Sequence, residues 1–152
     1  MPAHKLKQFL DDNHVKYISL RHSQAFTAQE IAESAHISGK DLAKTVIVTI
    51  DGKDAMAVLP ASRRVKPDVL KDAVGASTVE LGDEARFKNE FPGCEVGAMP
   101  PFGNLYGMDV YVDPTLAEDD EIAFNAGSHT ELVQLAYADF ARLAQPKVVT
   151  FS

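Results

Sequence analysis

Residues 43–50 read AKTVIVTI, Asp51-Gly52 follows, and residues 54–60 read DAMAVLP. Valine, isoleucine and threonine favour strands because their branched side chains pack well on a pleated surface. Asp-Gly is a common two-residue turn between antiparallel strands. The stretch therefore predicts a β-hairpin, and it is the clearest hairpin in the chain.

The segments on either side of this hairpin show a mixture of helical and strand patterns. Helices are predicted over residues 4–13, from a capping box at Thr27 and Glu30 onward, and over residues 67–73, 83–90 and 137–144. Strands are predicted over residues 15–20, 77–81, 108–113, 121–127, 130–135 and 147–151. Because hairpin-like neighbours are frequent, an α+β fold is favoured over a doubly wound parallel sheet. We expect a single domain, residues 1–152, with a mixed, largely antiparallel sheet surrounded by helices.

The composition is typical of a globular protein rather than a membrane protein. Of the 152 residues, 45% are hydrophobic and 24% are charged, and no run of about 18 apolar residues could span a bilayer. The first residues do not read as a signal peptide, and one cysteine allows no internal disulfide. We therefore expect a cytoplasmic protein without a membrane partner.

The charge of the chain limits how it could contact a nucleic acid. The formal net charge is −7, which argues against a broad basic face. Any contact must be local, and the one obvious basic cluster consists of Arg63, Arg64 and Lys66. Short clusters of this kind more often mark a solvated helix start.

Cys94 is the one candidate for a cysteine nucleophile. A cysteine hydrolase needs a histidine close in space to hold the thiolate, and no histidine is an obvious local base for Cys94. A lone cysteine beside a glycine is more often a structural thiol. The chain also has no CxxC and no HExxH motif, and its histidines are scattered, so we expect neither a metal nor a cofactor.

Lys44 stands out because it begins a strongly apolar strand. Alternation along the strand places its side chain on one face with Val46 and Val48. A lysine in this position usually extends to water. The alternative is a ligand for a phosphate or a carbonyl at the mouth of a pocket, since an ammonium is a compact charge with three donors.

Two loop segments could form the wall of a binding site. Residues 91–107, FPGCEVGAMPPFGNLYG, contain four of the nine glycines and three of the eight prolines, so they cannot form a regular helix or strand. Residues 124–132, FNAGSHTEL, combine a glycine with polar side chains at Ser128 and His129. A long structural turn in the first case and a plain hairpin turn in the second are the alternatives.

Taken together, these pieces resemble the YbaK/prolyl-tRNA synthetase-associated domain family of aminoacyl-tRNA deacylases. The resemblance covers essentially the whole chain. It is carried by DLAKTVIV, by CEVGAMPPFG with a GxxxP pattern at residues 97–101, by FNAGSH, and by RHSQAFTAQEIA near the front. The order and spacing of these pieces are more specific than any piece alone.

The resemblance implies a free-standing hydrolase of the ester between a wrong small amino acid and the terminal adenosine of a tRNA. The amino acid is of the alanine, cysteine, serine or threonine type, and the tRNA is often that for proline. A positioned water, helped by a ribose hydroxyl of the substrate, takes the place of a protein nucleophile. The catalytic residues that the resemblance implies are Lys44, Gly97, Ala98, Met99, Pro101 and His129.

Each of these residues has an implied role. Lys44 holds the tRNA end, and backbone amides of residues 97–101 surround the substrate carbonyl. Because prolines lack an N–H, Ala98 and Met99 are the better donors. His129 binds the substrate amine or orients the water.

The resemblance also implies residues that bind the substrate. Those expected at the amino acid and the tRNA end are His22, Phe26, Thr27, Thr45, Gly127 and Ser128. Those expected at the tRNA are Arg63, Arg64 and Lys66. The partners are the acceptor end of a mischarged tRNA and an aminoacyl-tRNA synthetase. Two hypotheses compete with this one: a non-catalytic tRNA- or synthetase-binding module of the same fold, and a hydrolase that depends on Cys94.

Overall fold

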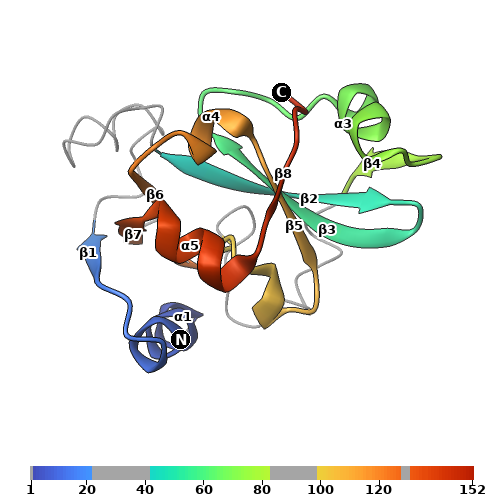
Figure 1. The fold of residues 1–152 in the computed structure, drawn as a ribbon. Helices are drawn as coiled ribbons and strands as arrows, with labels where there is room; N and C mark the ends of the chain where they lie inside the picture. The colour runs from blue at the N-terminus through green and yellow to red at the C-terminus, as the bar shows by residue number, and fades with distance from the viewer. Residues whose placement is uncertain (1, 22–41, 83–98, 128–130) are drawn as a thin grey trace.

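The computed structural model describes residues 2–21, 42–82, 99–127 and 131–152 (Figure 1). The helices in this part of the chain are α1 (Pro2–Asp12), α3 (Pro67–Val74), α4 (Pro114–Ala117), α5 (Tyr137–Ala144) and the short 3₁₀ turn η2 (Gly103–Leu105). The strands are β1 (Tyr17–Arg21), β2 (Ala43–Ile50), β3 (Lys53–Pro60), β4 (Val79–Leu81), β5 (Asp109–Val112), β6 (Glu121–Asn125), β7 (Glu131–Ala136) and β8 (Lys147–Val148).

The predicted hairpin is confirmed. Strands β2 and β3 pair antiparallel along their whole length, from Ala43 opposite Pro60 to Ile50 opposite Lys53. Asp51 and Gly52 form the turn with φ angles of 49° and 84°, the left-handed backbone that a tight two-residue hairpin requires. Asp51 adopts this left-handed backbone, and its carboxylate stabilises the turn by accepting hydrogen bonds from the amides of Ser77 and Thr78, each 2.9 Å long.

The strands form two sheets. The five-stranded sheet has the order β4-β2-β3-β5-β8 and the three-stranded sheet the order β1-β7-β6. Pairing is antiparallel except between β3 and β5 and between β5 and β8, so the predicted mixed, largely antiparallel α+β class is confirmed. An isolated parallel bridge between Leu42 and Ala123 links β2 to β6. Figure 1 shows α1 close to β1, α3 beside β4, and α5 crossing between the three-stranded sheet and β8.

A large apolar core lies between the two sheets and helices α1 and α5. Phe102 is its centre: the ring is fully buried, and the rings of Phe9, Phe124 and Phe140 stand edge-on to it at centroid distances of 5.6, 5.7 and 5.6 Å. A second cluster covers the other face of β2 and β3. Its buried members are Val48, Ala55, Ala57, Leu59, Leu70, Tyr111 and Phe151.

Some predicted boundaries differ from the structure. Strand β1 begins at Tyr17 rather than residue 15, and β8 covers only Lys147–Val148 rather than residues 147–151. Helix α4 was not predicted, although Asp113 caps it by accepting from the Thr115 amide at 2.8 Å and Pro114 fills its first position. The helices predicted after Thr27 and over residues 83–90 lie outside the described residues.

None of the helices that the structure describes is both long enough and apolar enough to cross a bilayer.

Candidate functional site

The structure places eight of the predicted site residues. These are Lys44, Thr45, Arg63, Arg64, Lys66, Met99, Pro101 and Gly127. The other predicted residues lie outside the described part of the chain: His22, Phe26, Thr27, Gly97, Ala98, Ser128 and His129, together with Cys94.

The start of β2 and the end of β6 lie side by side. The parallel bridge between Leu42 and Ala123 fixes their register, so Lys44 and Asn125 come two residues further along each strand in the same direction. Gly127 follows β6 with a φ of 93° and is buried, a conformation that glycine adopts without strain. Two segments far apart in the sequence therefore bring predicted site residues to one place.

Thr45 faces the large core. Its strand neighbours on that face, Ala43 and Ile47, belong to the same apolar cluster as Met99 and Phe102. Thr45 is only 5% exposed, and its Oγ1 has no hydrogen-bond partner among the described residues. A buried hydroxyl without a partner costs free energy. Packing alone therefore does not explain why a threonine rather than an apolar residue stands here.

The segment from Met99 to Phe102 packs against the same face. Met99 is 4% exposed, and both following prolines are buried. Within the described ranges, no residue accepts a hydrogen bond from the Met99 amide. The segment thus holds one backbone donor, and then two residues without any, against the start of β2.

Gly103 shows why this segment is rich in glycine. A Cβ atom at Gly103 would lie 2.5 Å from the Met108 carbonyl oxygen and 2.7 Å from a methyl carbon of Val110. Both distances are far below contact, so only glycine fits. The loop is held close to β5 by this approach.

Lys44 lies on the opposite face of β2 from Thr45. It shares that face with Val46 and Val48, as strand alternation predicts, and it is half-buried. Burial lowers the pKa of the Lys44 ammonium below its ordinary value of 10.5, and the positive charge of Arg64 lowers that pKa further. Met99 and Lys44 therefore approach the strand from different sides.

Asn125 is a residue that the sequence analysis did not select. Its Oδ1 is buried and, among the described residues, has no hydrogen-bond partner. It follows Ala123 by two residues, as Lys44 follows Leu42, so the bridge brings Asn125 and Lys44 to the same region. Asn125 stands in FNAGSH, the same motif as Gly127, and this place in the motif could have identified it as a candidate.

The three residues of the basic cluster, Arg63, Arg64 and Lys66, have different surroundings in the structure. Arg63 reaches the buried carboxylate of Asp113, with 3.9 Å between Nη1 and Oδ1. Arg64 is exposed and acts on Lys44. Lys66 is exposed and donates its backbone amide to the Phe151 carbonyl at 2.6 Å. Lys44 and Arg64 are thus the pair of predicted cations that the structure brings together.

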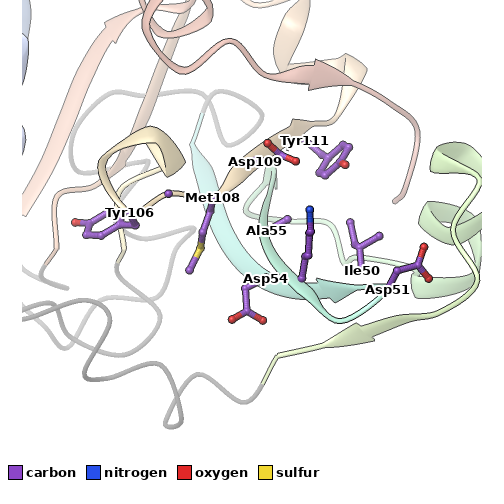
Figure 2. A pocket seen from close by; sticks show the side chains of 10 residues that line it. Ile50, Asp51, Asp54, Ala55, Tyr106, Met108, Asp109 and Tyr111 are labelled. Carbon is purple, nitrogen blue, oxygen red and sulfur yellow. The ribbon is translucent and has the colours of Figure 1, made fainter.

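The other end of the β2–β3 hairpin carries a separate pocket of about 770 Å³. Figure 2 shows Tyr106 and Met108 on one side of it and Ile50 and Asp51 on the other. Its remaining lining residues are Lys53, Asp54, Ala55, Gly107, Asp109 and Tyr111. It contains no predicted site residue, and its three carboxylates make it a poor place for a phosphate. Nowhere in the described part of the chain do three or more histidine, cysteine or acidic side chains gather as metal ligands would.

Comparison with known proteins gives a consistent picture. Residues 22–143 match the aminoacyl-tRNA editing domain family. The chain is 35% identical over 114 residues to the multifunctional Ser/Thr-tRNA deacylase ProXp-y of Escherichia coli (strain K12), a match that covers 72% of this chain and 68% of that protein. It is 28% identical over 120 residues to the proline–tRNA ligase of Maridesulfovibrio salexigens, covering 78% of this chain and 20% of the ligase.

A solved structure shares the fold. It is the crystal structure of a protein proposed to be a trans-editing enzyme for prolyl-tRNA synthetase, with a TM-score of 0.84 and 18% sequence identity. The match covers 99% of this chain and 96% of that one.

Proposed function

We propose that this chain, which belongs to the aminoacyl-tRNA editing domain family and is a hydrolase of the aminoacyl-tRNA ester, removes a small mischarged amino acid from tRNA in the cytoplasm. The candidates are alanine, cysteine, serine and threonine. The E. coli relative is a Ser/Thr-tRNA deacylase and matches this chain over comparable lengths, which favours serine and threonine. The match to part of a proline–tRNA ligase favours the tRNA for proline and a synthetase as partner.

One observation carries the proposal at the level of the site. The start of β2, the end of β6 and the segment that begins at Met99 meet, although they are distant in sequence. The Thr45 hydroxyl and the Met99 amide have no hydrogen-bond partner among the described residues. A buried side-chain hydroxyl such as that of Thr45, with no partner among the described residues, is typical of a place that a ligand completes.

The chemistry needs few protein groups. A water oxygen bonds to the ester carbonyl carbon, negative charge builds on the carbonyl oxygen, and the bond from that carbon to the ribose oxygen then breaks. The ribose oxygen takes a proton, so the products are the free amino acid and a tRNA with a free terminal hydroxyl. The backbone amide of Met99, and in this proposal that of Ala98, would donate to the carbonyl oxygen, and amides held in place stabilise such charge without reorganising.

The tRNA end needs a cationic contact, and Lys44 supplies it in this proposal. Lys44 lies at the start of β2, near the end of β6 and Gly127, on the opposite face of the strand from Met99. A held substrate gains rate through orientation, which in favourable cases contributes about 7–11 kcal/mol. His129 and Ser128 would complete the amino-acid side of the site.

A deacylation panel tests the proposal. Wild-type protein is incubated with tRNA for proline carrying alanine, cysteine, serine or threonine and with the tRNAs for serine and threonine carrying a non-cognate amino acid, and released amino acid is measured. We expect the protein to release at least one of the small amino acids from its tRNA. We expect no release of proline from correctly charged tRNA for proline. A protein inert toward the whole panel would contradict the proposal. Tight binding of a non-hydrolysable aminoacyl-adenosine analogue without turnover would indicate a binding module instead.

A further inference from the structure

The turn after β3 is closed by its own hydrogen bond and tied to two other parts of the molecule. The Ala61 amide donates to the Leu42 carbonyl at 2.8 Å, and the Arg63 amide donates to the Pro60 carbonyl at 2.9 Å. At its far end, the Lys66 amide donates to the Phe151 carbonyl at 2.6 Å. The turn is therefore held beside the start of β2, where Lys44 lies.

The side chain of Arg63 is used within this framework. Asp113 is 2% exposed, and a buried carboxylate needs hydrogen bonds and a counter-charge. It receives hydrogen bonds from the Thr115 amide and the Ser152 hydroxyl. Arg63 supplies the counter-charge at 3.9 Å. Its guanidinium thus ties the turn to the N-terminus of α4.

Arg64, the next residue, has no such partner among the described residues. It is exposed, and in the part of the chain that the structure describes neither Arg64 nor Lys44 forms an ion pair with a carboxylate. Lys44 lies opposite Leu59, and Arg64 follows in the turn that the Ala61 amide ties to the Leu42 carbonyl, so the backbone brings the two cations to one region and the Arg64 charge acts on Lys44. Like charges held together are unfavourable unless an anion lies between them, and a phosphate with several acceptor oxygens can accept from both.

We propose that the two neighbouring arginines have different functions: Arg64 binds a backbone phosphate of the single-stranded acceptor end together with Lys44, whereas Arg63 positions the turn through Asp113. This rests on the proposed function, because it takes tRNA as the substrate. In a chain of net charge −7, such a local pair also supplies the attraction that the rest of the surface does not.

The salt dependence of binding separates the two arginines. Binding of uncharged tRNA is measured across a series of salt concentrations for the wild type and for Arg64→Gln and Arg63→Gln, and thermal unfolding is measured for each protein. Each phosphate contact on a single strand contributes about 0.7 to the slope of log K against log salt. We expect Arg64→Gln to reduce the slope by about 0.7 and leave the unfolding midpoint unchanged. We expect Arg63→Gln to keep the slope and lower the midpoint by about 2–4 °C.

Two further measurements locate the phosphate. In a double-mutant cycle, Lys44→Gln and Arg64→Gln should be non-additive, because they share one phosphate. A tRNA that lacks its single-stranded acceptor end should bind all variants with equal slopes. Equal slope changes for Arg63→Gln and Arg64→Gln, or a full Arg64 effect on the shortened tRNA, would overturn the inference. A wild type that binds no tRNA would instead refute the proposed function, so the two failures are distinguishable.

Discussion

The ring of Phe102 stands edge-on to the ring of Phe124, with 5.7 Å between the centroids and 68° between the planes. Phe102 ends the segment that begins at Met99, and Phe124 lies on β6, just before Asn125 and Gly127. This contact therefore locks two parts of the candidate site to each other. Edge-on pairs of this kind add stability beyond the apolar area that they bury.

Phe102→Ala should lower the free energy of unfolding by about 3–5 kcal/mol, because it removes a fully buried ring that three other rings surround. Chemical denaturation measures this directly. The control Val148→Ala changes a side chain that is 52% exposed and should stay within about 0.5 kcal/mol of the wild type. A loss for Phe102→Ala no larger than that of the control would mean that the ring does not hold the segment.

Lys44→Met should reduce the rate of deacylation by about 100-fold, since a substrate end displaced by even an ångström loses that much rate. Methionine keeps the length of the buried stem and removes only the charge. Lys53→Met is the matched control: it lies at the other end of the same hairpin, opposite Ile50, and should retain wild-type activity. Steady-state deacylation of the best substrate from the panel measures both, and equal losses would argue against a specific role for Lys44.

The activity should also fall at high pH as Lys44 loses its proton. The pKa of Lys44 in the folded protein is lowered by burial and by Arg64. As the pH rises, the ammonium therefore loses its proton earlier than the ordinary pKa of 10.5 would give. The unfolded chain binds more protons between the lowered pKa and 10.5, so stability at this site rises with pH across that interval. In Arg64→Gln the alkaline limb of the kcat/KM profile should move to higher pH, after subtraction of uncatalysed ester hydrolysis. An alkaline limb that does not move in Arg64→Gln would mean that Arg64 does not affect the protonation of Lys44.

Thr45→Val should raise the stability of the protein and lower its rate of deacylation. Valine has the shape of threonine but no hydroxyl, and the Thr45 hydroxyl is buried with no partner in the described part of the chain. Its removal should raise the free energy of unfolding by about 1–3 kcal/mol while deacylation slows.

Thr49 provides the control on the same strand. Its hydroxyl donates to the Asp54 carboxylate at 3.0 Å, so Thr49→Val should lower the free energy of unfolding by about 0.5–1.5 kcal/mol without affecting turnover. If Thr45→Val is instead destabilising and fully active, the Thr45 hydroxyl serves the fold and not the substrate.

Cys94→Ser should retain deacylase activity, because the proposed chemistry uses water and no protein nucleophile. The same substrate panel measures it, with resistance of the wild type to a thiol-alkylating reagent as a second readout. A dead Cys94→Ser variant with an unchanged unfolding midpoint would restore the cysteine-hydrolase hypothesis.

Local patterns predicted the local elements well. The β2–β3 hairpin follows from branched residues around Asp51-Gly52, and α5 lies over Tyr137–Ala144 as its pattern indicated. The division of the strands into two sheets could not be predicted in this way. The sheets β4-β2-β3-β5-β8 and β1-β7-β6 combine strands that are distant in sequence, and the bridge that joins them connects Leu42 and Ala123, two residues that no local pattern connects.

The site shows the same limit. The sequence motifs selected Lys44, and strand alternation placed it correctly with Val46 and Val48. The different surroundings of Arg63 and Arg64 depend on Asp113, which follows β5 and reaches the turn only in the folded chain. Adjacent residues of one type cannot be told apart until their distant partners are known.

The pairing of β1 with β7 has a consequence for synthesis on the ribosome. Tyr17 lies opposite Leu135 and Arg21 opposite Glu131, so among the described strands the partner of the first strand is β7, which is translated long after it. Contacts of such long range form late and slow folding, whereas β2 and β3 can pair as soon as both have emerged. A nascent chain stopped before β7 should therefore expose β1 to protease, and one extended beyond α5 should protect it. Until that point the exposed edge of the hairpin is the part that a chaperone would meet first.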